Sequence, residues 1–117
     1  MKKNYDFNSK QVIDYVNDYV EEEDGCIYLT EEEWYDALGV EKDEIIGNDG
    51  NFKEGIEITF DGEKLAFEEQ ELACSVGAAL AKYGAEKYGG KWTLHWCEGA
   101  VAAWDKDKHS AGEIWGF

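Results

Sequence analysis

The sequence contains no arginine, so each of its positive charges is a lysine. Arginine supplies the planar, bidentate fork that usually grips phosphate groups, and lysine does not reproduce that geometry. The formal net charge is −16 at pH 7, which repels phosphate and anionic lipid and attracts basic surfaces. Together the two features argue against direct nucleic-acid binding and predict a cationic protein as the partner.

Long apolar runs are also missing, since no stretch approaches the roughly 20 apolar residues that a membrane span requires. The first ten residues, MKKNYDFNSK, lack the apolar core of a secretion signal behind their lysines. Three cysteines, Cys26, Cys74 and Cys97, form an odd set without paired spacing, which is typical of free thiols in a reducing compartment. We therefore expect a cytoplasmic protein without disulfide bridges or a membrane partner, in the host cytoplasm if a phage encodes it.

The chain nevertheless has enough apolar material for one hydrophobic core, with 44% hydrophobic residues and seventeen aromatics in 117 residues. Its charge is unevenly distributed. Residues 1–72 hold 22 of the 27 acidic residues against six lysines, whereas residues 73–117 hold five of each and four of the five tryptophans. Because no repeat or linker separates the two parts, we predict a single domain over 1–117 with an acidic part and a neutral, tryptophan-rich part.

Three helices are predicted from apolar residues at helical spacing. Asn8 or Ser9 is placed to cap the first, whose core face would include Tyr19 with neighbouring valines and isoleucine. Thr30 and Glu33 form a capping box for the second. The expected ranges are 9–23, 31–38 and 69–88, and one more helical turn could follow within 41–46.

Period-two alternation and turn residues predict strands between and after these helices. Asp61-Gly62 is a hairpin turn that would pair Ile58 with Leu65 and Ile56 with Phe67. Hairpins over 56–67 and 91–104, with a last strand at 113–117, would form one small antiparallel sheet, and Cys26–Leu29 is also β-prone. We therefore predict an α+β fold in which the long third helix packs on the sheet.

One side of the long helix carries only small residues, which lets another backbone approach closely. A sheet of the same chain is the favoured cover, and a second copy of the chain is the alternative. A homodimer would then form through Cys74, Ala78, Ala81 and Ala85.

The outer faces of the first two predicted helices consist almost entirely of carboxylates. Residues four apart on a helix lie about 6 Å apart along the axis, a spacing loosely comparable to that of charges on a nucleic-acid backbone. Solubility alone is the competing interpretation of such faces. The predicted partner-binding residues are Asp14, Asp18, Glu21, Glu22, Glu23, Asp24, Glu31, Glu32 and Asp36.

Motifs for catalysis, cofactors or metals are scarce. His95 and Cys97 lie two apart on a predicted strand, where an imidazole could activate a thiol, but no third group that would orient the histidine is identifiable. The cysteines and histidines lack zinc-site spacing, and the loop around Asp49 lacks the ligand alternation of a calcium site. We predict no catalytic residue, cofactor or metal.

In charge and size, residues 1–72 resemble the small acidic inhibitors that phages and mobile elements direct at restriction enzymes, CRISPR effectors or DNA-repair glycosylases. The resemblance rests on no motif. It implies a DNA mimic, of anti-restriction or anti-CRISPR type, that occupies the basic nucleic-acid groove of a larger protein. One alternative is an immunity or antitoxin protein that contacts a basic toxin through an exposed Trp104 or Trp115. The other alternative is a small enzyme that uses Cys97 and His95.

Overall fold

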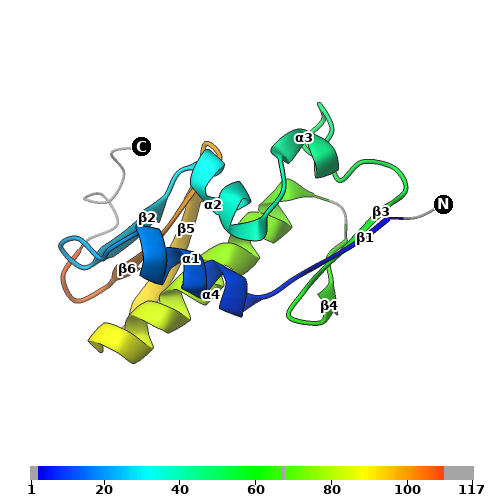
Figure 1. Ribbon diagram of the computed structural model, residues 1–117. Coiled ribbons are helices and arrows are strands. Elements are labelled where there is room, and N and C mark those ends of the chain that lie inside the picture. The colour runs from blue at the N-terminus through cyan, green and yellow to red at the C-terminus, as the bar shows by residue number, and fades with distance from the viewer. Residues whose placement is uncertain (1–2, 67, 110–117) are drawn as a thin grey trace.

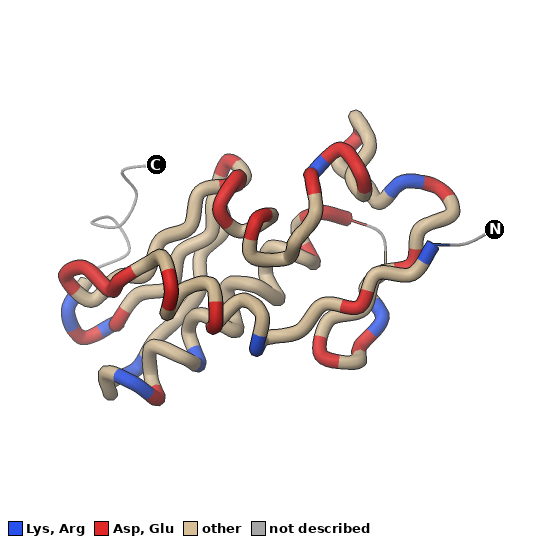
Figure 2. The backbone as a smooth tube through the Cα atoms, viewed as in Figure 1, with Lys and Arg blue, Asp and Glu red and all other residues tan. Residues whose placement is uncertain are grey.

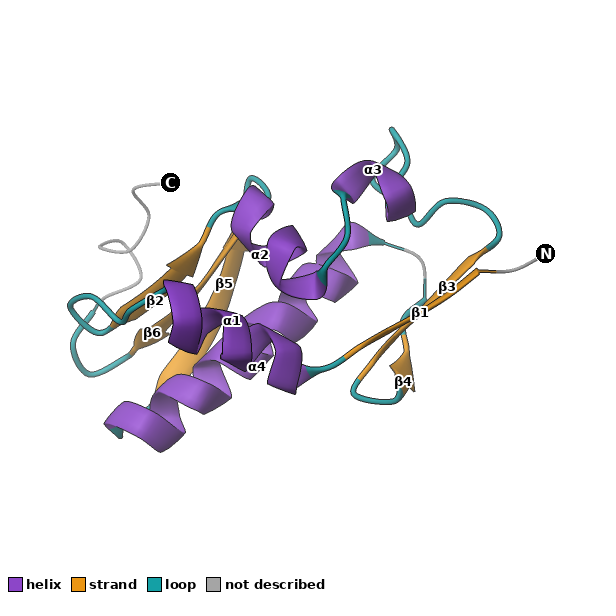
Figure 3. Ribbon diagram, in the orientation of Figure 1, coloured by secondary structure: helices purple, strands orange, loops and turns teal. Residues whose placement is uncertain are grey.

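The computed structural model describes residues 3–66 and 68–109, which form four helices and two three-stranded sheets (Figures 1 and 3). The α+β class predicted from the sequence is confirmed, although the helices number four rather than three. In chain order the elements are β1 (Lys3–Phe7), α1 (Ser9–Tyr19), β2 (Cys26–Leu29), α2 (Glu31–Leu38), α3 (Lys42–Ile45), β3 (Ile56–Phe60), β4 (Glu63–Lys64), α4 (Glu69–Tyr88), β5 (Trp92–Cys97) and β6 (Ala100–Asp105).

Helix α4 lies at the centre of the molecule, as expected for the long helix. One side packs on β5 and β6 of an antiparallel sheet with strand order β2-β6-β5, and α1 packs on another side (Figure 1). Leu72, Val76 and Leu80 of α4 are fully buried, and so are Ile27 and Val101 of the sheet. The main hydrophobic core therefore forms between this helix, the sheet and the helices α1 and α2.

Two small residues of α4, Gly77 and Gly84, are buried under strand β5 of the same chain. A Cβ atom at Gly77 would lie 3.0 Å from the Cβ of Leu94, and one at Gly84 would lie 2.6 Å from the ring of Trp92. Strand β5 therefore fits on a side of the helix that glycine leaves open. Ala78 is exposed, whereas Cys74, Ala81 and Ala85 are half-buried.

The second sheet has the order β1-β3-β4 and lies at the opposite end of the molecule from the first (Figure 3). Strand β1 pairs in parallel with β3, from Lys3 beside Ile56 to Phe7 beside Phe60. The single antiparallel sheet predicted from the sequence is therefore wrong, because β3 takes its long neighbour from the N-terminal segment rather than from the C-terminal strands.

The hairpin at Asp61-Gly62 forms with the predicted register but is shorter than predicted. Its ladder joins only Glu63 and Lys64 to β3, and the Leu65 amide then donates to the Ile58 carbonyl at 2.9 Å. The hairpin over 91–104 is confirmed as β5 and β6, with Trp92 opposite Asp105 and Cys97 opposite Ala100. Phe67 and the predicted strand 113–117 lie outside the described residues.

Helix α1 ends at Tyr19, four residues before the predicted end at residue 23. The following Val20 is extended, and Asp24 and Gly25 both have positive φ, 53° and 79°. These two residues form the tight turn that leads into β2, and the backbone groups of Glu23 and Cys26 pair across it at 2.9 and 3.0 Å. Glu21, Glu22, Glu23 and Asp24 therefore lie in a connection rather than on a helix face.

Helix α2 begins and ends where its sequence signals predict. Thr30 accepts from the Glu33 amide at 3.3 Å, and the Glu33 carboxylate accepts from the Thr30 amide at 2.9 Å. Gly39 closes the helix in the left-handed region, with φ of 77°. Inside the helix, the fully buried Trp34 donates its indole N–H to the Gly99 carbonyl at 2.6 Å, which fixes α2 against the β5–β6 turn.

No helix among the described residues is both long enough and apolar enough to cross a membrane.

Candidate functional site

Residues 14–44 are a strongly acidic stretch of the chain, because they carry thirteen carboxylates and one lysine, a net charge of −12. These residues run from the second half of α1 through β2 and α2 to α3. Acidic positions recur along this part of the chain in Figure 2, whereas lysines mark the last turns of α4. We call this part of the chain the acidic surface; it contains the nine predicted partner-binding residues together with Glu33, Glu41, Asp43 and Glu44.

Most of the predicted partner-binding residues face solvent. Seven of the nine are exposed, and Glu22 and Glu31 are half-buried. Lys10 pairs with Asp14 at 2.7 Å and Lys42 with Glu31 at 3.2 Å, and Glu22 accepts a short hydrogen bond from the Gly25 amide. A further set makes no side-chain hydrogen bond or ion pair with any described residue: Asp18, Glu21, Glu32 and Asp36.

Two of these carboxylates occupy positions that do not favour their own helices. Asp18 lies in the last turn of α1 and Asp36 near the end of α2, and neither last turn contains a basic residue. The C-terminal end of a helix carries partial negative charge, so a carboxylate there is destabilising by about 0.3–1 kcal/mol. Helix stability therefore does not explain these two acids.

A groove opens in the acidic surface where α1 ends, beside β2 and the first turn of α2. It has a volume of about 610 Å³, and we call it the tyrosine groove. The described residues of its lining supply two aromatic rings, two small apolar side chains and three carboxylates, but no lysine. The lining residues are Tyr19, Val20, Glu21, Glu23, Cys26, Tyr28 and Glu33.

Tyr19 lies exposed at this groove, so its predicted place in the core is wrong. Its side chain is 75% exposed, because α1 ends at this residue and no further turn covers it. The ring lies 5.0 Å from that of Tyr15, one turn earlier on the helix. The exposed Tyr19 ring therefore lines the groove and packs on one side against the Tyr15 ring.

Partial burial raises the pKa of one thiol and one phenol in the groove and of a tyrosine on the neighbouring helix α1. Burial, followed by the charge of Glu22, raises the pKa of Cys26 from 9.0 to about 11. Burial and the nearby Glu33 raise the pKa of Tyr28. Burial, then the charges of Glu33 and Asp36 on α2, raises the pKa of Tyr15 on α1.

A smaller hollow of about 230 Å³ lies between α2 and α3 and differs in its electrostatics. Its lining includes Lys42, which pairs with Glu31 at 3.2 Å and with Glu69 at 3.7 Å. The buried Tyr35 also donates to Glu69, at 2.5 Å. Lys42 therefore already lies in this hollow and neutralises Glu31, although Glu32 and Asp36 of the same lining have no such partner among the described residues.

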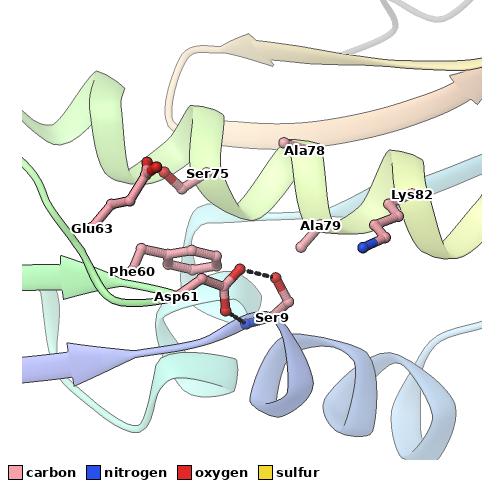
Figure 4. Close-up of a pocket in the computed structure, with 8 residues that line it drawn as sticks. All are labelled: Ser9, Phe60, Asp61, Glu63, Ser75, Ala78, Ala79 and Lys82. Atoms are coloured by element: carbon pink, nitrogen blue, oxygen red, sulfur yellow. Dashed lines mark hydrogen bonds between the residues drawn. The ribbon is translucent and has the colours of Figure 1, made fainter.

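A third hollow, of about 340 Å³, lies between α4, the start of α1 and the β3–β4 turn (Figure 4). There Asp61 accepts from the Ser9 amide at 2.7 Å and, over a short distance, from the Ser9 hydroxyl. Lys82 lines the same hollow, but the hydrogen bonds drawn in Figure 4 run only between Ser9 and Asp61. The Asp61 carboxylate thereby ties the β3–β4 turn to the N-terminus of α1.

The histidine and cysteine considered for an enzyme occupy neighbouring same-side positions on β5. His95 pairs with Ala102 and Cys97 with Ala100. The His95 ring meets Trp104 edge-on, with ring centroids 6.1 Å apart, and burial lowers the pKa of His95. Because Trp104 is only 8% exposed, it is not the exposed anchor that the antitoxin alternative invokes, and Trp115 lies outside the described residues.

The described residues contain no cluster of three or more histidine, cysteine, aspartate or glutamate side chains suited to a metal ion. The cysteines within this part of the chain are free thiols. His109 is one of the two histidines whose spacing does not fit a zinc site, and its ring makes a short contact with the Asp24 carbonyl.

The sequence located the carboxylates but not the groove. Glu33 is recognisable only as a cap, and Tyr19 matches the core periodicity of α1. The Asp24-Gly25 pair was the available signal, since the same turn dipeptide correctly predicted the hairpin at Asp61-Gly62. Comparisons with protein-family models, with curated proteins and with solved structures found no match to this chain.

Proposed function

We propose that this chain is an acidic inhibitory protein that occupies the basic nucleic-acid-binding surface of a larger protein. The observation that carries the proposal is the acidic surface, with thirteen carboxylates against one lysine in residues 14–44. A basic groove built for nucleic acid attracts such a surface by the same long-range electrostatic field.

The placement of the acids supports a binding role over solubility alone. Solubility requires charge somewhere on the surface, and it does not require acids at the ends of helices that they destabilise. Asp18 and Asp36 hold such positions. Acids that weaken their own fold are expected where binding uses them, because function and stability compete at such sites.

The tyrosine groove favours a second candidate, an immunity or antitoxin protein that neutralises one basic toxin. A concave, aromatic contact gives a more specific interface than a field of exposed charges. Such a complex would persist at salt concentrations at which a purely electrostatic complex dissociates.

Capture of partners on the immobilised full chain tests the first proposal. A bacterial lysate is applied, bound proteins are released by a salt gradient or by competing DNA, and the released proteins are identified by mass spectrometry. We expect a nucleic-acid-binding enzyme that both salt and DNA displace. A single partner that resists salt and ignores DNA supports the second candidate, and a column that retains nothing contradicts both.

Two variants of equal net charge test whether the acidic surface makes the contact. The surface variant carries Asp18→Asn, Glu21→Gln, Glu32→Gln and Asp36→Asn. The control variant carries Glu54→Gln, Glu63→Gln, Glu86→Gln and Asp107→Asn, which are also exposed.

Each variant has a net charge of −12 in place of −16. The surface variant is expected to lose about tenfold or more in affinity for the captured enzyme, since exposed charge pairs contribute about 0.2–1 kcal/mol each. It should also show a flatter dependence of affinity on salt. Equal losses in both variants would mean that net charge, rather than the acidic surface, drives binding.

A further inference from the structure

We propose that the tyrosine groove receives an arginine side chain of the basic partner. This inference rests on the proposed function, because it names the group through which that partner is anchored. It does not depend on which enzyme or toxin the partner is.

The charge of the groove defines the sign of its occupant. Glu21, Glu23 and Glu33 supply three carboxylates to the lining, and none of the described residues in the lining is a cation. One oxygen of Glu33 holds the Thr30 amide at 2.9 Å, so this carboxylate has a fixed position. The hollow between α2 and α3 lacks this property, because Lys42 already lies in it.

The aromatic walls select arginine over lysine. A guanidinium is planar and weakly hydrated, so it stacks on a ring and also forms paired hydrogen bonds to a carboxylate. The lysine ammonium is a compact, strongly hydrated charge that gains less from a ring. Tyr19 presents an exposed ring at the groove, and Tyr28 supplies a second ring from β2.

The position of the rings suits capture of a side chain from outside. Tyr28 packs beside the buried Trp104 and Ala102, so its wall is anchored in the sheet. Tyr19 is supported by Tyr15 on the same helix, with ring centroids 5.0 Å apart. The groove therefore has preformed walls and needs little rearrangement on binding, which favours affinity.

Titration of the full chain with hexa-arginine and with hexa-lysine, followed by two-dimensional amide NMR at low salt, tests the proposal. We expect hexa-arginine to shift the resonances of Tyr19, Glu21, Tyr28 and Glu33 most strongly. Hexa-lysine should bind more weakly and shift resonances over α2 and α3 without this focus.

Two pairs of variants locate the contact. Tyr19→Ala should weaken hexa-arginine binding about two- to fivefold, the range expected for the loss of one exposed cation–π contact. Tyr88→Ala removes another exposed tyrosine, 40% exposed and outside the groove, and should change the affinity less than twofold. Glu21→Gln should likewise weaken binding more than Glu32→Gln, which lies outside the groove.

Equal affinities for the two peptides, or an unchanged affinity in Tyr19→Ala, would overturn the proposal. So would shifts that spread over the acidic surface without reaching the groove. None of these results involves the natural partner, so each would leave the proposed function standing. Failure of partner capture with intact, Tyr19-dependent arginine binding would instead reject the proposed function and leave only the groove's selectivity for arginine.

Discussion

Cys26 is the residue whose chemistry depends most directly on the groove. It lines the hollow from β2, and burial with the nearby Glu22 raises its pKa to about 11, from an ordinary 9.0. The folded protein therefore keeps this thiol protonated between pH 9 and 11, where the unfolded chain loses the proton. The difference in pKa makes the free energy of unfolding depend on pH. The stability linked to the protonated thiol is fully present below pH 9 and is lost as the pH rises toward 11.

The thiol is consequently expected to react slowly in the folded protein. With Cys74→Ala and Cys97→Ala in place, alkylation of Cys26 by iodoacetamide at pH 8 should be about 10- to 100-fold slower than in urea-unfolded protein. Mass spectrometry at timed intervals measures both rates. The folded rate should rise up to about pH 11. A plateau already at pH 9 would contradict the raised pKa.

At the scale of elements, the sequence predicted helices and hairpins best where the residues that specify them are close together in the chain. Helices α2 and α4 and the β5–β6 hairpin formed as expected, because their caps, periodicity and turn residues are neighbours in the sequence. Strand β1 was missed because its parallel partner β3 lies about fifty residues away. The groove was missed for the same kind of reason: folding brings Glu33 beside Glu21 and Glu23.

The contact between α4 and β5 depends on glycine at two helix positions. Gly84→Ala would place a methyl group 2.6 Å from the Trp92 ring, which forces the strand or the ring to move. Such overpacking costs about 1–3 kcal/mol, partly offset by the roughly 1 kcal/mol by which alanine favours a helix over glycine. We expect the free energy of unfolding, measured by urea denaturation, to fall by up to about 2 kcal/mol.

Gly77→Ala provides the comparison within the same helix. Its added methyl group would lie 3.0 Å from Leu94, a milder conflict, so this variant should be less destabilised than Gly84→Ala. If both variants were more stable than the original chain, helix propensity would dominate and the close approach of β5 would not limit packing.

At the scale of the whole molecule, charge is separated along the chain rather than spread evenly. The acidic surface carries −12 of the total −16, whereas residues 73–117 are balanced. Carboxylates so concentrated repel one another, and this repulsion lowers the stability of the folded state. The same concentration gives the molecule a directed field toward a basic partner, so binding and stability make opposite demands on these residues.

This opposition predicts that neutralising the acidic surface stabilises the protein while weakening its binding. At 10 mM salt, the variant with Asp18→Asn, Glu21→Gln, Glu32→Gln and Asp36→Asn should gain about 1 kcal/mol in free energy of unfolding, since each close like-charge pair is destabilising by about 0.2–0.5 kcal/mol. At 1 M salt the gain should vanish, because the screening length falls to about 3 Å. Urea denaturation at both salt concentrations measures the difference.

The control variant, with the same net charge but neutralised outside the acidic surface, separates local from global repulsion. It should gain less than half as much at 10 mM salt, because its four acids lie outside the stretch in which carboxylates are concentrated. An equal gain would assign the cost to net charge as a whole. The acids at the ends of α1 and α2 would then carry no cost of their own, and their placement would cease to support a binding role over solubility.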